Sequence, residues 1–565
     1  MPSTTLAHRR SRRAPHRGAA PASRRGEGAG ALALYVALSL VIIGRAALTG
    51  TGPGSGPGAG TLGIGPDVQI FLWGLRWWPH ALGHGLDPLR SPVVWPPYGG
   101  AVLWSSTVPL LSVLATPLTF ALGSPLTWNL LVVLAPALAA WSAWLLCAEL
   151  GATPAPALFG GALFGFGSFV LCEDIAHLQL SACLLLPLAG WLAVRGVRGR
   201  ICAGGLAARC AAIVVAEFLL SPELLVTLAL MMVVGLALAL GLRVQAREAL
   251  RGTAAALAGG AVAGAILVSP LVIEMLTHVP RSSSAAVQWP LDLLNLVVPT
   301  ARDAVGGAAL TGISSRFPGN LAEQTGYLGL PLLLVIVIWG WRERRCAAAR
   351  WLILLLAIAA LLALGSALTV DGTRTIWLPW AALSRLPLLR DVLPVRMMIF
   401  VWLGAAVISA LWLSDTRIAA PARASAALLV AVSLIPASWP FQAGPAAARS
   451  AAVHAALRDQ RVLSLPFFDV GDRGLLVQEQ DGFRFSLTDS WLQLRPRDWA
   501  PALPGTALTD RALARLRGRA AARFVAELRA AHITRLLLWE EPPGLLAALG
   551  LPHARIAEVV IVRVS

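Results

Sequence analysis

Long apolar runs recur along the whole chain and are separated by short polar connections. Most are long enough to cross a bilayer as helices of about 20 residues. The pattern therefore predicts a polytopic, all-α transmembrane bundle with about 11 to 13 membrane helices. The runs fall at 31–49, 105–122, 127–148, 157–172, 178–194, 205–220, 222–242, 253–273, 326–341, 351–369, 397–413 and 424–439.

Arginines gather in four of the short connections, which predicts that these connections face the cytoplasm. They lie at 195–200, 243–251, 342–350 and 417–423. If the N-terminus is also inside, these four connections can all face the cytoplasm only when residues 157–195 cross the membrane once. We therefore expect one of the two Gly-rich runs, 157–172 and 178–194, to be broken or re-entrant. The alternative of two full crossings stays open, as does a cleaved signal peptide in place of an uncleaved first span.

The remaining segments are too polar to span. Residues 1–30 read as a disordered, basic cytoplasmic tail. The transmembrane domain covers 31–440, with a first extracytoplasmic loop at 50–104 in which residues 68–78 form an interfacial amphipathic helix. Residues 441–565 predict a small extracytoplasmic α/β domain, with strands near 462–468, 533–539 and 556–564 and a helix capped by Thr509.

Composition agrees with this organisation. Of the 565 residues, 57% are hydrophobic and 13% are charged, and the mean hydropathy is +0.70, far above globular usage. The 46 basic residues, all Arg, outnumber the 29 acidic ones. We attribute this excess to membrane topology and expect no nucleic-acid partner, because little soluble surface is left to carry a basic face.

Two acidic positions are candidates for chemistry. Asp67 follows the first span, where a carboxylate can act as a general base or help to hold a divalent cation. A helix cap is an equally good interpretation of Asp67. Glu173, Asp174 and His177 fall between two apolar runs, and ionisable residues at membrane depth favour a functional role over a solvated turn.

Arginines expected at the outer membrane edge are candidate partners for a lipid-linked phosphate, because a guanidinium can bind two phosphate oxygens together. Taken singly, each is better explained as an interface anchor. Arg396 is the strongest candidate, since it begins a span directly after Pro394-Val395. The others are Arg76, Arg281, Arg302, Arg316 and Arg390.

The layout resembles bacterial membrane glycosyltransferases of the GT-C superfamily, particularly members from high-GC bacteria. The resemblance rests on short motifs spread over most of the chain. They are Gly65-Pro66-Asp67-Val68-Gln69, Trp77-Trp78-Pro79-His80, Gly85-Leu86-Asp87-Pro88, Trp95-Pro96-Pro97-Tyr98-Gly99, Phe164-Gly165-Phe166, His177-Leu178-Gln179, Leu386-Pro387, Pro394-Val395-Arg396, Leu465-Pro466 and Gln480-Asp481-Gly482-Phe483.

The resemblance implies a GT-C fold in the bacterial cytoplasmic membrane. It also implies an inverting transfer of a sugar from a polyprenyl-phosphate donor to a glycan, lipid or protein acceptor outside. Asp67 would be the catalytic base, and Arg76, Arg302, Arg316, Arg396, His177 and Gln69 would bind substrate or phosphate.

The sequence departs from many relatives at Gln69, where they carry a second acid. A divalent cation such as Mg or Mn would then need ligands from Glu173 or Asp174, and catalysis without a metal is the alternative. Two other functions remain open: a transporter or lipid flippase, and a catalytically degenerate GT-C-like protein that serves in envelope assembly.

Overall fold

The computed structural model is mainly helical and describes residues 21–49, 60–65, 67–278, 288–386, 389–466, 473–488 and 513–565. Within this part, eight helical segments are long and apolar enough to cross a membrane. They are α1–η1–α2 (Pro21–Ser39, Leu40–Gly44, Arg45–Thr49), α6 (Ser124–Leu150), α7–α8 (Pro154–Gly165, Ser168–Glu173), α9–α10 (Leu178–Ser181, Leu185–Val197), α11 (Ala203–Leu220), α12 (Pro222–Gly241), α13 (Arg247–Thr277) and η4–α18 (Pro394–Met397, Met398–Ser414).

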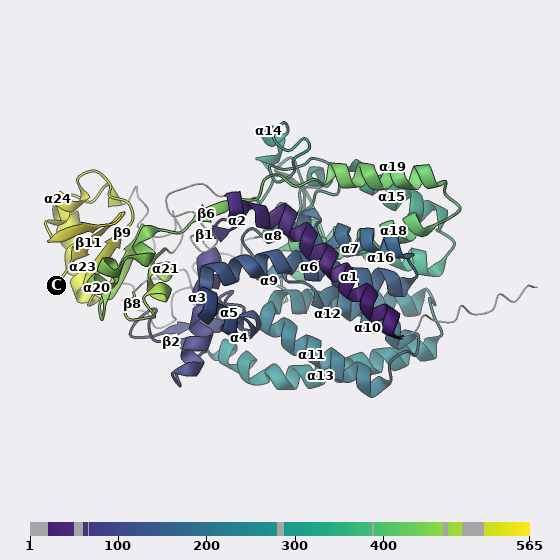
Figure 1. Ribbon diagram of the computed structural model, residues 1–565, viewed down its shortest axis with the longest axis horizontal. Coiled ribbons are helices and arrows are strands. Elements are labelled where there is room, and N and C mark those ends of the chain that lie inside the picture. Colours follow the sequence, from purple (N-terminus) through teal and green to yellow (C-terminus); the bar gives the residue numbers. More distant parts are fainter. Residues whose placement is uncertain are drawn as a thin grey trace, which may run out of the picture.

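Three shorter apolar helices join them: α15 (Gly329–Arg342), α16 (Ala347–Ala363) and α19 (Ala420–Ser433). The long helices run side by side along the longest axis of the molecule (Figure 1). Glycine lets α7 pack closely against α6, since a Cβ at Gly165 would lie 2.4 Å from the carbonyl oxygen of Pro136. The predicted polytopic helical bundle is confirmed, and the chain is a multi-pass membrane protein.

The crossings differ from the prediction in one place. Residues 105–122 form no single span, because prolines at 109 and 117 start two short helices, α4 (Pro109–Leu114) and α5 (Thr116–Leu122). Both members of the Gly-rich pair, in contrast, are long enough to span. The expected single net crossing over 157–195 is therefore wrong, because both helical segments are long enough to span. One span fewer at 105–122 and one more at 157–195 leave eleven apolar segments in total.

Ion pairs support this reassignment. Glu149, at the end of α6, contacts Arg198 at 3.1 Å and Arg200 at 2.5 Å, in the connection after α10. The end of α6 and the end of α10 therefore lie on the same side of the bundle. Of the expected disordered tail, residues 1–20 fall outside the described part, whereas α1 already begins at Pro21.

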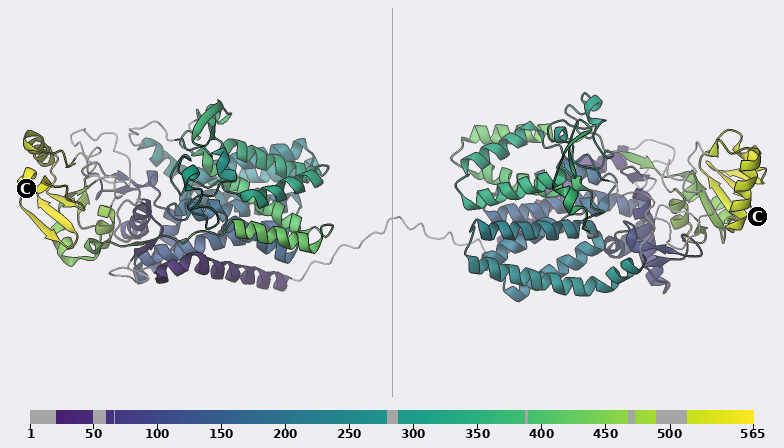
Figure 2. Two further views of the ribbon diagram at one scale, coloured as in Figure 1. Left: turned by 90° about the horizontal axis from the view of Figure 1, so that it is seen from above. Right: turned by 180° about the vertical axis from the view of Figure 1, so that it is seen from behind.

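The C-terminal region is a five-stranded sheet with flanking helices, beyond one end of the bundle (Figure 2). The strand order is β10 (His553–Ile556), β11 (Val559–Arg563), β9 (Arg535–Leu538), β7 (Arg461–Leu465) and β8 (Ser486–Leu487). Strand β7 is parallel to β8 and β9, and the other pairs are antiparallel. The three predicted strands are confirmed. A helix, α23 (Gly518–Ala530), does precede β9, but its N-cap is Arg517, so the expected capping of this helix by Thr509 is wrong. Thr509 itself lies outside the described residues.

The first loop and the C-terminal region share one hydrophobic core. Helix α3 (Asp67–Gly83) inserts Trp73 and Trp77 against Phe483, with ring centroids 5.5 and 5.4 Å apart. The Trp73 indole nitrogen donates to Gln478 Oε1, 2.8 Å away, in α21 (Arg473–Gln480). Strand β1 (Gly60–Leu62) also pairs with β6 (Phe441–Ala443). These contacts fix α3, and with it Asp67, between the bundle and the sheet.

Candidate functional site

Asp67 is positioned by the backbone that precedes it. The amide of Ile64 donates to the carbonyl of Ile175 at 2.9 Å, and the amide of Gly63 donates to that of Pro440. Gly63 has φ +92°, and a Cβ there would lie 2.2 Å from the Ile175 oxygen. Only glycine permits this approach, so the segment before Asp67 is held against the turn that carries His177.

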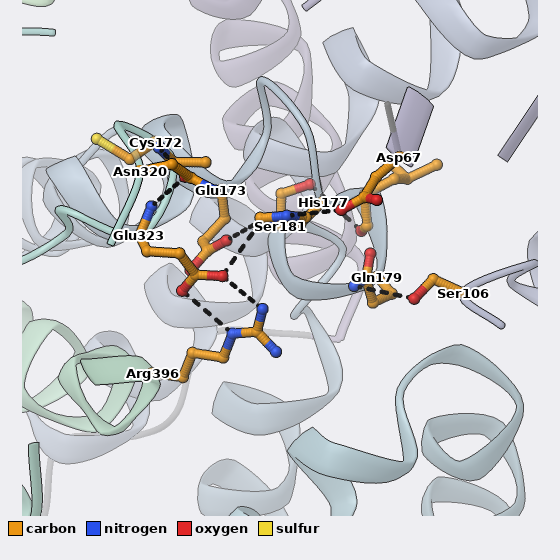
Figure 3. A network of polar contacts seen from close by, with 12 residues as sticks. Asp67, Ser106, Cys172, Glu173, His177, Gln179, Ser181, Asn320, Glu323 and Arg396 are labelled. Atoms are coloured by element: carbon orange, nitrogen blue, oxygen red, sulfur yellow. Dashed lines mark hydrogen bonds and ion pairs between the residues drawn. The ribbon is translucent and has the colours of Figure 1, made fainter. Parts of the chain in front are cut away.

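That turn breaks the membrane helices between α8 and α9. Glu173 ends α8, and His177 precedes α9. The His177 Nδ1 lies 2.6 Å from Glu173 Oε2, and its Nε2 lies 3.1 Å from Asp67 Oδ2 (Figure 3). Glu173 is fully buried, whereas the Asp67 side chain is 32% exposed. The imidazole thus connects a buried carboxylate to one that solvent can reach.

A second pair of charges extends the cluster. Glu323, in the loop before α15, lies 3.7 Å from His177 Nδ1 and 2.5 Å from Arg396 Nη2. Arg396 also forms an ion pair with Glu223, at the start of α12. We call Asp67, Glu173, His177, Glu323, Arg396 and Glu223 the acid–histidine cluster.

Both His177 nitrogens face carboxylate oxygens, which only the doubly protonated ring can satisfy by donation. Burial alone would lower the pKa of His177, but the hydrogen bonds to Asp67 and Glu173 and the nearby Glu323 charge raise it to about 10. The ring is therefore a cation in this arrangement, and it stabilises the ionised form of Asp67.

Glu173, His177 and Glu323 also form a set of groups that can hold a metal ion. One donor atom from each lies within 4.8 Å of the others. The Oε1 of Glu173 is buried and has no hydrogen-bond partner, so it is available as a ligand. A nitrogen with carboxylate oxygens suits a divalent cation such as Mn. Binding would displace the Nδ1 proton of His177.

Sequence reasoning did not identify Glu323. It stands singly in a polar loop, where no spacing links it to another acid. The usable signal was its place just before a span, which it shares with Arg396. The side chain of Asp174 is fully buried, and it takes no part in the contacts described above.

The other predicted residues lie elsewhere. Arg76 approaches Glu479 of the C-terminal region at 3.7 Å, and Arg316 pairs with Asp371 at 2.6 Å. Arg302 covers the Trp439 ring, and its Nε and Nη2 are buried without a hydrogen-bond partner. Gln69 is buried on α3. Of these four arginines, the structure brings only Arg396 into the acid–histidine cluster, and two carboxylates already hold its guanidinium.

The same architecture is found in proteins of known structure. A family model described as "Domain of unknown function (DUF6311)" matches residues 32–435. No curated protein matches the sequence. Among solved structures, the chain is similar to the arabinofuranosyltransferase AftD from Mycobacteria, with a TM-score of 0.61 and 14% identity, covering 96% of this chain. It spans only 40% of the length of AftD.

The archaeal oligosaccharyltransferase AglB from Archaeoglobus fulgidus, solved with an inhibitory peptide and a dolichol-phosphate, is also similar. The TM-score is 0.53 at 12% identity, over 91% of this chain and 69% of that one. Both neighbours are glycosyltransferases of the GT-C fold. At these identities the similarity shows a shared fold, and the fold class of this chain is therefore of GT-C type.

Proposed function

The chain belongs to the DUF6311 family, and we propose that it is a membrane glycosyltransferase that transfers a sugar from a polyprenyl-phosphate donor to an acceptor hydroxyl. The acceptor is a glycan, lipid or protein at the outer face of a bacterial cytoplasmic membrane. One observation carries the proposal: Asp67 is the solvent-reachable end of a buried acid–histidine cluster, within a fold shared with GT-C glycosyltransferases.

In the proposed reaction, the acceptor oxygen attacks the anomeric carbon while its proton passes to Asp67. The bond between that carbon and the phosphate oxygen breaks, and polyprenyl phosphate leaves with the bonding electrons, inverting the anomeric centre. His177 orients the carboxylate of Asp67. Fixed positive groups near the leaving phosphate stabilise the charge that develops in the transition state.

Arg302 is the phosphate ligand that we propose first, because its Nε and Nη2 have no hydrogen-bond partner among the described residues. Arg396 holds Glu323 and Glu223, and we assign it to positioning these acids. Glu173, His177 and Glu323 would hold a divalent cation. When bound, that cation supplies positive charge for a phosphate oxygen. Arg76 and Arg316 stay predicted substrate contacts.

The test is Asp67→Asn in the full chain, reconstituted in nanodiscs. Synthetic polyprenyl phosphates carrying arabinofuranose, mannose, glucose or galactose serve as donors, and envelope membranes supply acceptors. Removing a general base costs about 10²- to 10⁴-fold in rate, so sugar transfer and release of polyprenyl phosphate should fall by that factor.

Asp87→Asn is the matched control, since Asp87 lies in the same loop and its carboxylate accepts from a local backbone amide, that of Leu89. It should keep transfer unchanged. Undiminished turnover in Asp67→Asn would refute the assignment of the base.

A further inference from the structure

A cavity lies beside α3, away from the acid–histidine cluster. It has a volume of about 320 Å³ and lies between the start of α6, strand β6 and helix α21. Gln69 and Leu72 of α3 line it. At about 100° per residue, Gln69 is rotated roughly 160° from Asp67 around the helix axis. Helix α3 therefore separates the cavity from Asp67.

Two buried acceptors at this cavity have no hydrogen-bond donor among the described residues. Gln69 is 4% exposed, and its Oε1 has no hydrogen-bond partner. Glu479 is 1% exposed; its Oε1 accepts from Ser124 and Gln480, whereas its Oε2 has only Arg76 Nε at 3.7 Å. A buried acceptor without a donor is costly, so these two oxygens are suited to accept hydrogen bonds from the hydroxyl or amide groups of a ligand.

The charges around the cavity balance. Arg449 and Arg473 line it together with Glu479 and Glu558. A phosphate or carboxylate in the cavity would be repelled by two acids as well as attracted by two arginines. The lining charges therefore do not favour an anionic ligand over a neutral one. The rest of the lining is mostly small, apolar or backbone groups, including Gly60, Gly123 and Pro445. The volume is in the range of small-molecule sites, and the chemistry fits a neutral, hydroxyl-rich ligand.

We propose that this cavity binds a neutral sugar unit of the acceptor, remote from the hydroxyl that reacts. The identification of the ligand as acceptor rests on the proposed function. Sugar hydroxyls would donate to Gln69 Oε1 and Glu479 Oε2. Binding energy from such a remote unit helps to orient the reacting group, which is how non-reacting parts of a substrate contribute to catalysis.

The experiment measures binding without transfer. The full chain in nanodiscs is titrated with neutral trisaccharides of arabinofuranose, mannose, glucose and galactose and followed by saturation-transfer NMR, with inorganic phosphate and a glucuronate trisaccharide as charged probes. We expect at least one neutral probe to bind. Gln69→Leu should weaken that binding at least tenfold, and Ala443→Trp, which narrows the cavity, should abolish it.

Arg523→Ala, on the exposed face of α23, and Asp67→Asn should bind the same probe as the unaltered chain does. Failure of every neutral probe, tighter binding of a charged probe, or unchanged binding in both Gln69→Leu and Ala443→Trp would overturn the proposal. Because the readout needs no turnover, a normal transfer rate in Asp67→Asn would refute the base assignment and leave this result standing.

Discussion

Charge does not balance within the acid–histidine cluster. The four carboxylates of Asp67, Glu173, Glu223 and Glu323 face two cations, His177 and Arg396. If all the acids are ionised, two negative charges remain, and uncompensated charge is costly in a buried site. A divalent cation held by Glu173, His177 and Glu323 would replace the Nδ1 proton of His177 and would reduce the excess to one negative charge.

We therefore expect Mn²⁺ to stabilise the protein, because a ligand that binds only the folded state raises the free energy of unfolding. The thermal midpoint should rise with added Mn²⁺ and fall back with EDTA. Glu173→Gln and Glu323→Gln should each remove most of this shift. Glu217→Gln, another buried acid on α11, is the matched control and should keep it. An equal shift in Glu323→Gln would argue against the site.

Among the elements, the segment from β1 to α3 sets the site geometry. We expect Gly63→Ala to displace this segment, since the new Cβ would lie 2.2 Å from the Ile175 oxygen. The contact between Asp67 and His177 would be lost, and sugar transfer should fall at least tenfold while the protein still inserts. Gly85→Ala is the control, because Gly85 also has positive φ but open space around its Cβ position. Equal rates in the two variants would contradict this role of Gly63.

The sequence predicted the bundle and the three C-terminal strands because both depend on local apolar patterns. It failed where tertiary contacts decide. Residues 105–122 are apolar enough to span, yet Pro109 and Pro117 divide them into two helices. Asp67 and His177 could be singled out separately as candidate residues. Their contact joins two residues 110 positions apart in the sequence, so no local pattern predicts it. For Glu323 the only local signal is its place just before a span, and no spacing links it to another acid.

At the scale of the whole molecule, the eleven apolar segments give a consistent topology with the N-terminus inside. The connection near residue 152 then faces the cytoplasm with Arg198 and Arg200, to which Glu149 is tied. The sequence-based topology, which counts 105–122 as a span, would instead place the connection near residue 152 outside. Reporter fusions after residues 152 and 345 should both read cytoplasmic, and a fusion after 445 should read external. An external reading at 152 would restore the sequence-based assignment.

The junction between the bundle and the C-terminal region should respond to pH through Glu479. Burial raises its pKa from 4.5 to about 7, with hydrogen bonds from Gln480 and Ser124 and the charge of Arg76 opposing the shift only in part. Between these two values the folded state binds more protons than the unfolded state. Stability should therefore fall as pH rises through this window, by about 3 kcal/mol at most.

Thermal midpoints measured from pH 4.5 to 8 test this expectation. Glu479→Gln keeps a neutral side chain of similar shape, so its midpoint should lack the decline that the unaltered chain shows, and the two curves should diverge most above pH 7. Glu540→Gln, in the exposed segment after β9, leaves the junction intact and should reproduce the decline. Parallel curves for Glu479→Gln and the unaltered chain would mean that this carboxyl does not govern how firmly the sheet is joined to the bundle.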